Sequence, residues 1–276
     1  MNNKIKAIPA IVNILLLGLS LTCIYPLIWL GYSSMKTDND FLSNLFALPG
    51  HIEWNNYYMA VVKSRIYAYF FNTIFNAVTS VAIILVLSFC IGYFLCRYNF
   101  KGKGFINLLL TLGMIVPVHS LLVPMYIQFK LLGMVDKRGV LILPYLGVML
   151  PLAVFLIEAY VKTIPVELEQ SAGLEGASLF TILTKIIVPI SKPILITVII
   201  LTFNFVWNEM PFALILNASE NVRNIAVGIM NFSSSYDTKW TQRIAACVVA
   251  VFPVLIIYIF FNKQIIQGMT EGSIKG

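Results

Sequence analysis

Six stretches without any charged residue constrain this chain more than any other feature of its sequence. They cover residues 7–35, 66–96, 104–129, 139–157, 193–208 and 244–262. A helix needs about 20 apolar residues to cross the hydrocarbon core of a lipid bilayer, and five of the stretches reach or nearly reach that length. The 193–208 stretch is shorter, but apolar sequence continues over 210–216 after a lone Glu209. Because a β-barrel would instead alternate polar and apolar residues in segments of about ten, the pattern favours helices.

The composition excludes a water-soluble domain. Hydrophobic residues make up 59% of the chain and charged residues 11%, whereas a soluble domain carries about 25% charged residues and needs a polar surface. We therefore predict an all-α membrane protein with six transmembrane helices, forming a single domain over residues 1–276 with a tail over 263–276. The predicted spans are approximately 9–34, 68–95, 105–129, 139–160, 190–216 and 244–262.

The positive charges leave the orientation of these spans open. If both termini lie in the cytoplasm, ten Lys and Arg residues fall on the cytoplasmic side and nine on the other. Cytoplasmic loops are usually more positive than loops on the other side. A nearly equal division of the positive charges therefore gives little support for this orientation. The net charge of +7 fits attraction to anionic lipid headgroups, so we expect the lipid bilayer, and no nucleic acid, as its partner.

Prolines interrupt the third and fourth spans. Pro117 and Pro124 fall in the third, and Pro144 and Pro151 in the fourth. A proline inside a helix removes a backbone hydrogen bond and bends the helix. These prolines indicate either simple kinks between packed helices or a bundle with a polar centre that can open. Four of them in two neighbouring spans favour the second interpretation.

Polar side chains within the spans point the same way. Such residues can hold helices together through hydrogen bonds, or they can line a path for a substrate. A charge at the bilayer centre costs roughly 2.5–3.5 kcal/mol on insertion scales, so the one carboxylate among them should face a cavity, a partner or the interface. We predict that seven residues line a translocation path: Asn72, Asn76, His119, Asn204, Trp207, Asn208 and Glu209.

The segment between the fourth and fifth spans, residues 163–189, reads as a helix, a glycine turn and a second helix. Pro165 suits the first position of the first helix, Gly173 and Gly176 supply the break, and Ser178 can cap the second helix. The second helix has one apolar face, formed by Leu179, Ile182, Leu183 and Ile186. Such a segment can lie in the membrane interface or dock into a groove of a soluble partner. The glutamates and the glycine turn favour docking.

This segment resembles the EAA loop of ABC importer permeases. Glu169-Gln-Ser-Ala-Gly-Leu-Glu-Gly176, then nine residues, then Ile186-Ile-Val-Pro189 follow its pattern, with Gln170 and Ser171 replacing the usual Glu and Ala and Glu175 replacing the usual Asp. Further resemblances lie at Phe71-Asn72-Thr73 and at Trp207-Asn-Glu-Met-Pro-Phe-Ala-Leu214, and the tail Gly268–Gly276 is similar to that of the smaller membrane subunit of the maltose importer. Together they indicate the carbohydrate-uptake subfamily.

The resemblance implies a type I ABC importer (MetI-like) permease fold with a cytoplasmic coupling helix and both termini in the cytoplasm of a cell-membrane protein. It implies a heterodimer with a homologous second permease subunit, two ATPase subunits that bind ATP-Mg, an extracellular sugar-binding protein, and a sugar substrate, with oligosaccharides favoured. The residues expected to couple to the ATPase are Glu167, Glu169, Gln170, Ser171, Ala172, Gly173, Glu175 and Gly176, and the tail residues expected to contact it are Glu271, Gly272, Ser273 and Lys275.

The sequence gives no sign of an enzyme. It contains no G-x-x-x-x-G-K-[ST] phosphate loop and no acid–base pair, nucleophile or metal-ligand cluster. We therefore expect no catalytic, cofactor or metal site in this chain. The alternative function is a proton-coupled secondary transporter with Glu209 and His119 as a proton relay. Such transporters usually contain internal repeats, and the sequence has no clear one.

Overall fold

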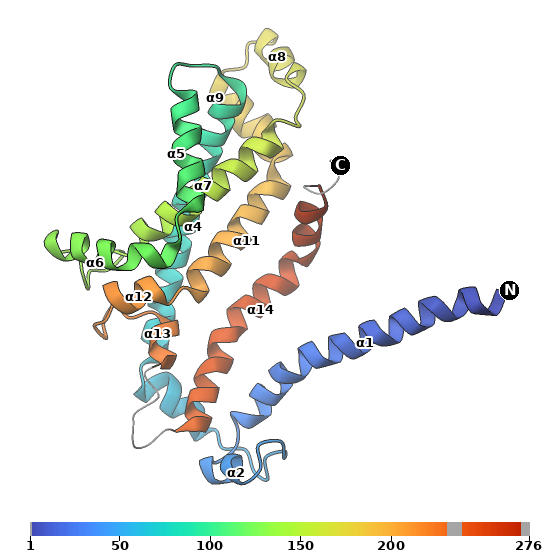
Figure 1. Cartoon of the computed structure of the whole chain (residues 1–276), viewed down its shortest axis with the longest axis vertical. Coiled ribbons are helices and arrows are strands. Elements are labelled where there is room, and N and C mark those ends of the chain that lie inside the picture. The colour runs from blue at the N-terminus through green and yellow to red at the C-terminus, as the bar shows by residue number, and fades with distance from the viewer. Residues whose placement is uncertain (1, 231–238, 272–276) are drawn as a thin grey trace. The chain divides into compact units, whose positions relative to one another are not determined.

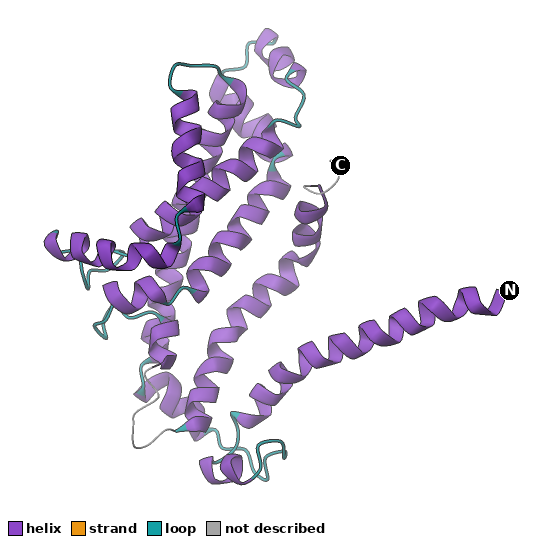
Figure 2. Cartoon of the chain, in the orientation of Figure 1, coloured by secondary structure: helices purple, strands orange, loops and turns teal. Residues whose placement is uncertain are grey.

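The computed structural model describes the backbone of residues 2–230 and 239–271, and the side chains of residues 12–230 and 239–261. Figure 2 shows that this part of the chain consists of helices and connecting loops, with no strand. The elements, most of the α-helices among them labelled in Figure 1, are α1 (Asn2–Ser33), α2 (Asp38–Ser43), α3 (Asn55–Tyr58), η1 (Met59–Lys63), α4 (Ile66–Arg97), α5 (Lys103–Ile115), η2 (Val118–Leu121), α6 (Leu122–Leu131), α7 (Ile142–Val161), α8 (Glu167–Leu174), α9 (Leu179–Ile182), η3 (Leu183–Ile187), α10 (Val188–Ile190), α11 (Lys192–Asn208), α12 (Pro211–Leu216), α13 (Ile225–Met230) and α14 (Trp240–Glu271).

Four of the described helices are each long and apolar enough to cross a membrane alone. They are α4, α7, the Val12–Ser33 part of α1 and the Trp240–Phe261 part of α14. Two bent pairs raise the number to as many as six: Lys103–Ile115 with Val118–Leu131, and Leu179–Ile190 with Lys192–Asn208. The bent pairs occupy the regions of the predicted third and fifth spans.

Contacts divide the chain into two compact units, and the boundary runs through α4, α13 and α14. The first unit comprises Met1–Tyr67 and Gly228–Phe252. Polar contacts order the segment that follows α1 in this unit. The buried Lys36 ammonium donates to the carbonyls of Asn44 and Leu45 at 3.1 and 3.2 Å. Asp38 accepts hydrogen bonds from the backbone N–H and the hydroxyl of Thr241. These bonds fix α2 against the first turn of α14.

The second unit comprises Ala68–Val227 and Pro253–Gly276, and α7 lies at its centre. Four residues of α7 are buried and recur at the helical spacing that places them on one face: Ala153, Val154, Ile157 and Val161. Gly92 of α4 permits a close approach to this face. A β-carbon at position 92 would lie 3.1 Å from the backbone nitrogen of Glu158 and from the carbonyl oxygen of Val154.

The third span is broken rather than kinked. The helix ends at Ile115, and the direction changes by 96° before the chain continues through η2 and α6. Pro117, which has no N–H to donate, stands at this break. The prediction that all four prolines bend their helices is wrong for Pro124 and Pro144. Each is the third residue of its helix, where the N–H has no partner inside the helix in any case. Only Pro151 lies within the body of α7.

The fifth span is interrupted at both ends. Leu179–Ile190 and α11 meet at 75°, and α11 ends at Asn208 instead of continuing to residue 216 as predicted. The chain is non-helical at Glu209 and resumes as α12 at Pro211. The lone carboxylate of this predicted span therefore marks a helix break.

The contact between α4 and α7 gives a test of the packing. We expect Gly92→Ala to destabilise the chain by about 1–3 kcal/mol, because the added methyl group meets backbone atoms that must move apart. Gly147→Ala in α7 is the matched control, since nothing lies within 4 Å of its β-carbon position. Unfolding of detergent-solubilised protein, followed by tryptophan fluorescence, measures both variants. Equal midpoints for the two variants would contradict the close packing.

Candidate functional site

The predicted coupling loop, residues 163–189, has a defined helix–turn–helix structure at one end of the second unit (Figure 1). Gly176 forms the turn with a φ of +83°, a conformation that side chains with a β-carbon strongly resist. The Ser178 hydroxyl accepts a hydrogen bond from the Thr181 N–H and so caps α9 as predicted. Gly173, in contrast, lies inside α8, so the prediction that it shares in the break is wrong. Pro165 precedes Val166, which caps α8, so its predicted place as first residue of that helix is wrong as well.

One face of this loop is anchored in the second unit. Ile182 and Ile187 are buried, and Leu183 and Ile186 are partly buried against the same core. Leu179, the fourth member of the predicted apolar face, is exposed. The predicted apolar face is therefore largely internal and is not free to lie in a membrane interface.

A second apolar surface of the loop points away from the unit. Leu174 and Phe180, on either side of the Gly176 turn, are 92% and 75% exposed. Large apolar side chains that are exposed together are typical of a surface that contacts a partner.

The coupling residues predicted from the sequence fall into two groups. Most are at the surface of this chain: Glu167, Gln170, Ser171, Gly173, Glu175 and Gly176 are exposed and Ala172 is half-buried. Glu169 instead turns inward. One carboxylate oxygen lies 2.7 Å from Arg97 Nε, and the other accepts a hydrogen bond of 2.6 Å from the Tyr93 hydroxyl.

Sequence reasoning missed Tyr93 and Arg97 as members of this site. Arg97 also donates from Nη2 to the carbonyl of Ile164 at 2.8 Å. The only local signal was that Arg97 is the charge that ends the 66–96 stretch. Its partner Glu169 lies 72 residues further along the chain, and a single sequence contains no sign of that pairing.

A second set of polar residues forms a buried chain of hydrogen bonds around the α11–α12 break. Asn76 donates to the Asn224 side chain at 3.0 Å, and Asn224 donates to the Tyr145 hydroxyl at 3.4 Å. Tyr145 in turn donates to Glu209 at 3.0 Å. The Glu209 carboxylate also accepts from the backbone N–H groups of Phe212 and Ala213 at 2.6 and 3.2 Å. Glu209 therefore caps the N-terminus of α12, where an anion is favourable.

The seven predicted path residues thus do not form one exposed surface. Asn76, Trp207 and Glu209 are buried within the second unit. Asn204 and Asn208 are exposed and hydrogen-bonded to each other, and His119 is exposed in η2. Asn72 is half-buried and donates to the carbonyls of Asn221 and Arg223. The path prediction stays a prediction for all seven residues, and Glu209 has Tyr145 rather than His119 as its hydrogen-bonding side-chain partner.

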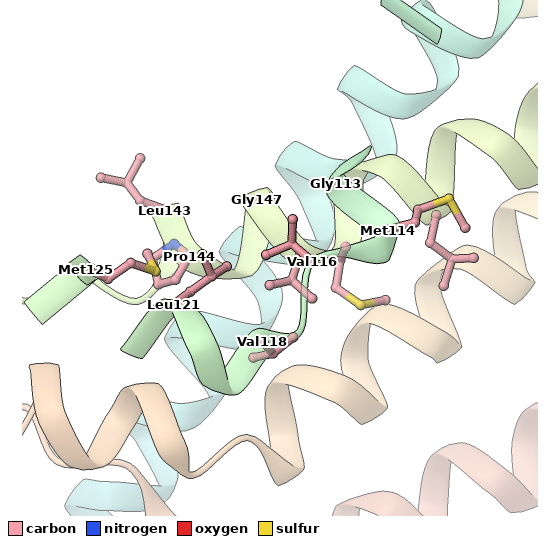
Figure 3. A pocket seen from close by; sticks show the side chains of 12 residues that line it. Gly113, Met114, Val116, Val118, Leu121, Met125, Leu143, Pro144 and Gly147 are labelled. Carbon is pink, nitrogen blue, oxygen red and sulfur yellow. The ribbon is translucent and has the colours of Figure 1, made fainter. Parts of the chain in front are cut away.

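A pocket of about 390 Å³ lies where the broken third span passes α7 (Figure 3). All of its lining side chains are apolar or absent: Gly113, Met114, Val116, Val118, Leu121, Met125, Leu143, Pro144, Gly147, Val148, Met149 and Leu152. A ligand rich in hydroxyl groups would leave them unpaired there, at a cost in free energy. The pocket therefore does not suit a polar ligand.

The predicted tail contacts lie outside what the structure describes. Gly272, Ser273 and Lys275 are beyond the last described residue, and the side chain of Glu271 is not among the described side chains.

Comparison with known proteins decides the family. Residues 88–271 match the family described as "Binding-protein-dependent transport system inner membrane component". The chain belongs to this family. A similar relative is the probable ABC transporter permease YurM of Bacillus subtilis (strain 168), which is 34% identical, with 91% of this chain and 84% of the relative covered. The arabinooligosaccharide transport permease AraQ of the same organism is 31% identical over 94% of this chain and 92% of the relative.

The fold of the permease also matches solved structures. A chain of a bacterial ABC transporter that imports the acidic polysaccharide alginate superimposes with a TM-score of 0.77 at 22% identity, covering 93% of this chain and 96% of the other. The predicted fold class, an all-α membrane permease of the ABC importer type, is confirmed. The permease is a multi-pass inner-membrane transport subunit, not an enzyme. The proton-coupled alternative has no support among these relatives.

The buried network gives a test of what Glu209 does in the permease. We expect Glu209→Ala to destabilise the protein by about 2–3 kcal/mol, because two backbone N–H groups and the Tyr145 hydroxyl lose their acceptor. Tyr145→Phe removes only the bonds through its hydroxyl and should cost about 1 kcal/mol. Denaturant unfolding of the purified protein measures both. A Glu209→Ala variant as stable as the parent would contradict the capping role.

Proposed function

We propose that the permease is one of two membrane subunits of an ATP-driven sugar importer, with oligosaccharides as the substrate class. Several similar proteins are named for such substrates. The diacetylchitobiose uptake permease NgcG of Streptomyces coelicolor is 29% identical over 96% of this chain and 89% of the relative, and AraQ is named for arabinooligosaccharides. These relatives match over nearly their whole lengths, which supports a shared role for the whole chain.

The importer we propose is a heterodimer of this permease and a homologous second permease, with two ATPase subunits and an extracellular sugar-binding protein. The sequence contains no G-x-x-x-x-G-K-[ST] phosphate loop, so in this proposal the ATPase subunits hold ATP-Mg and the permease itself needs no cofactor. Dependence on a binding protein is what the family description states. Both termini lie in the cytoplasm, which puts the 163–189 loop on the side where ATP is available.

The observation that carries this proposal is the 163–189 loop itself. It turns at Gly176 with a positive φ, is anchored by one apolar face, and exposes Leu174 and Phe180 on the other. A surface of this kind fits a groove on a soluble subunit. When ATP binding closes the ATPase dimer, the docked loops move together. The broken third and fifth spans then rearrange and open the path toward the binding protein.

This coupling requires the loop to bind the ATPase differently in its two states, because only differential binding shifts a conformational equilibrium.

The accessible residues Asn72, His119, Asn204 and Asn208 are the ones we propose for the path. The tail residues 271–275 are proposed to reach the ATPase dimer. The alternating-access cycle involves no covalent chemistry in this chain.

Replacement of Gly176 tests the proposal. In proteoliposomes that contain the whole complex, the binding protein and labelled oligosaccharide, we expect Gly176→Val to reduce ATP-driven uptake by at least about tenfold, within the range of coupling free energies between sites. A β-branched residue cannot readily adopt the positive φ that the turn requires. The unaltered complex should transport with ATP in the presence of an uncoupler.

Gly133→Val is the matched control. Gly133 also has a positive φ, of +66°, and nothing within 4 Å of its β-carbon position, but it lies outside the 163–189 loop. The Gly133→Val substitution should introduce similar backbone strain while leaving the turn at Gly176 intact. Normal uptake by Gly176→Val, or uptake that an uncoupler abolishes while ATP is maintained, would contradict the proposed function.

A further inference from the structure

The buried ion pair between Arg97 and Glu169 joins three elements of the second unit. Arg97 is the last residue of α4, Glu169 lies in the first turn of α8, and the Ile164 carbonyl follows the end of α7. The two charged side chains are only 9% and 11% exposed. An ion pair so shielded from solvent is screened little by salt, and it constrains geometry because each group has few alternative partners.

The hydrogen bonding of this junction is specific. Each carboxylate oxygen of Glu169 has its own donor, Arg97 Nε at 2.7 Å for one and the Tyr93 hydroxyl at 2.6 Å for the other. Tyr93 and Arg97 are four residues apart, so they lie on one face of α4. A rotation or shift of α8 relative to α4 would break these bonds together. The 163–189 loop is therefore fastened to α4, a helix that is far from it in sequence.

Near its N-terminal end, α4 also forms hydrogen bonds with residues 221–225. Thr73 accepts a hydrogen bond from the backbone N–H of Ile225 at 2.9 Å, and Asn72 donates to the carbonyls of Asn221 and Arg223. Thr73 and Arg97 are separated by 24 residues of α4, or about 36 Å of helix at the usual rise per residue. Figure 1 shows α8 and α12 toward opposite ends of the second unit. One continuous helix thus connects the 163–189 loop to the 217–224 loop, which joins α12 to α13.

We propose that Arg97, Tyr93 and Glu169 are positioning residues that make α4 part of the coupling path. Movement of the 163–189 loop is carried through the ion pair to α4, and along α4 to the 217–224 loop. This inference rests on the proposed function, since it assumes that an ATPase moves the loop. It adds a specific polar route from the loop to α4, beside the apolar core that Ile182 and Ile187 share with Ile84 and Tyr93 of α4.

A merely structural ion pair and a coupling ion pair predict different results. The structural role lowers the amount of assembled complex but leaves the sugar imported per ATP hydrolysed unchanged in what does assemble. The coupling role lowers that ratio. Coupling between two sites through one element is established only when both sites are shown to shift the conformation of that element. The experiment must therefore measure the effect of ATP at both ends of α4.

The experiment uses the whole complex in proteoliposomes and measures uptake and ATP hydrolysis in the same vesicles. We expect Arg97→Gln, Glu169→Gln and the double variant each to lower the sugar imported per ATP on the order of tenfold. The double variant should be no worse than either single variant, because all three remove the same interaction. Lys101→Gln, which removes an exposed charge in the loop after α4, is the control and should keep the parental ratio.

A second variant separates coupling from folding. Removing one partner of a buried ion pair leaves an unpaired charge, whereas apolar replacements of similar size are often tolerated. Tyr93→Phe/Arg97→Met/Glu169→Leu should therefore assemble and still show the lowered ratio. A fluorescent probe at Ala218→Cys, in a background without the native cysteines, should lose its ATP-dependent signal in this variant.

Two outcomes distinguish failure of this inference from failure of the proposed function. If the unaltered complex couples ATP to uptake and the triple variant keeps both the parental ratio and the signal at position 218, the role of the ion pair is overturned alone. If the unaltered complex shows no ATP-driven uptake, the proposed function fails, and the inference with it.

Discussion

A break in a transmembrane helix exposes backbone groups that water cannot reach, and the structure depends on how it satisfies them. In hydrocarbon each unsatisfied N–H or C=O costs several kcal/mol. At the α11–α12 break the Glu209 carboxylate accepts from two of the freed N–H groups and from Tyr145. A charge that would be unfavourable in a continuous span is therefore useful where the span is interrupted.

The same principle explains the contrast between the two ends of the second unit. Around Glu209, polar groups are buried and satisfied inside the chain, through Asn76, Asn224 and Tyr145. At the 163–189 loop, Glu169 is satisfied internally by Arg97 and Tyr93, while apolar side chains at the turn remain exposed. The internal bonds give the loop a fixed shape, and the exposed side chains give it a surface for a partner. A loop that transmits force from a partner, as we propose for this one, needs both the fixed shape and the exposed surface.

Local patterns predicted much of this molecule. The uncharged stretches indicated the helices, the positive φ at Gly176 follows from its place between two helices, and Ser178 caps α9 as its spacing indicates. What local patterns could not give was the direction in which a polar residue points. Glu169 and Glu175 look equivalent in sequence, yet one is held inside and the other is exposed. That difference depends on Arg97, whose position is set by the packing of α4 on α7.

The prolines also show that a local pattern does not fix where a helix breaks. Pro117 and Pro124 are seven residues apart in one apolar stretch, but only the first stands at a break, because a new helix begins at Leu122 and places the second in its first turn. The buried polar network was likewise unpredictable in its pairing. Asn72 and Asn76 are both predicted path residues, but their hydrogen-bond partners lie about 150 residues further along the chain.

The most direct test of the account is a crosslink from the tip of the 163–189 loop. A photoreactive probe attached to Leu174→Cys, in the assembled complex without other reactive cysteines, reports what that exposed tip contacts. The account predicts that the crosslinked product, identified by mass spectrometry, is the ATPase subunit and that its yield changes between nucleotide-free and ATP-bound states. Crosslinks to lipid alone, while the ATPase is bound to the complex elsewhere, would contradict it.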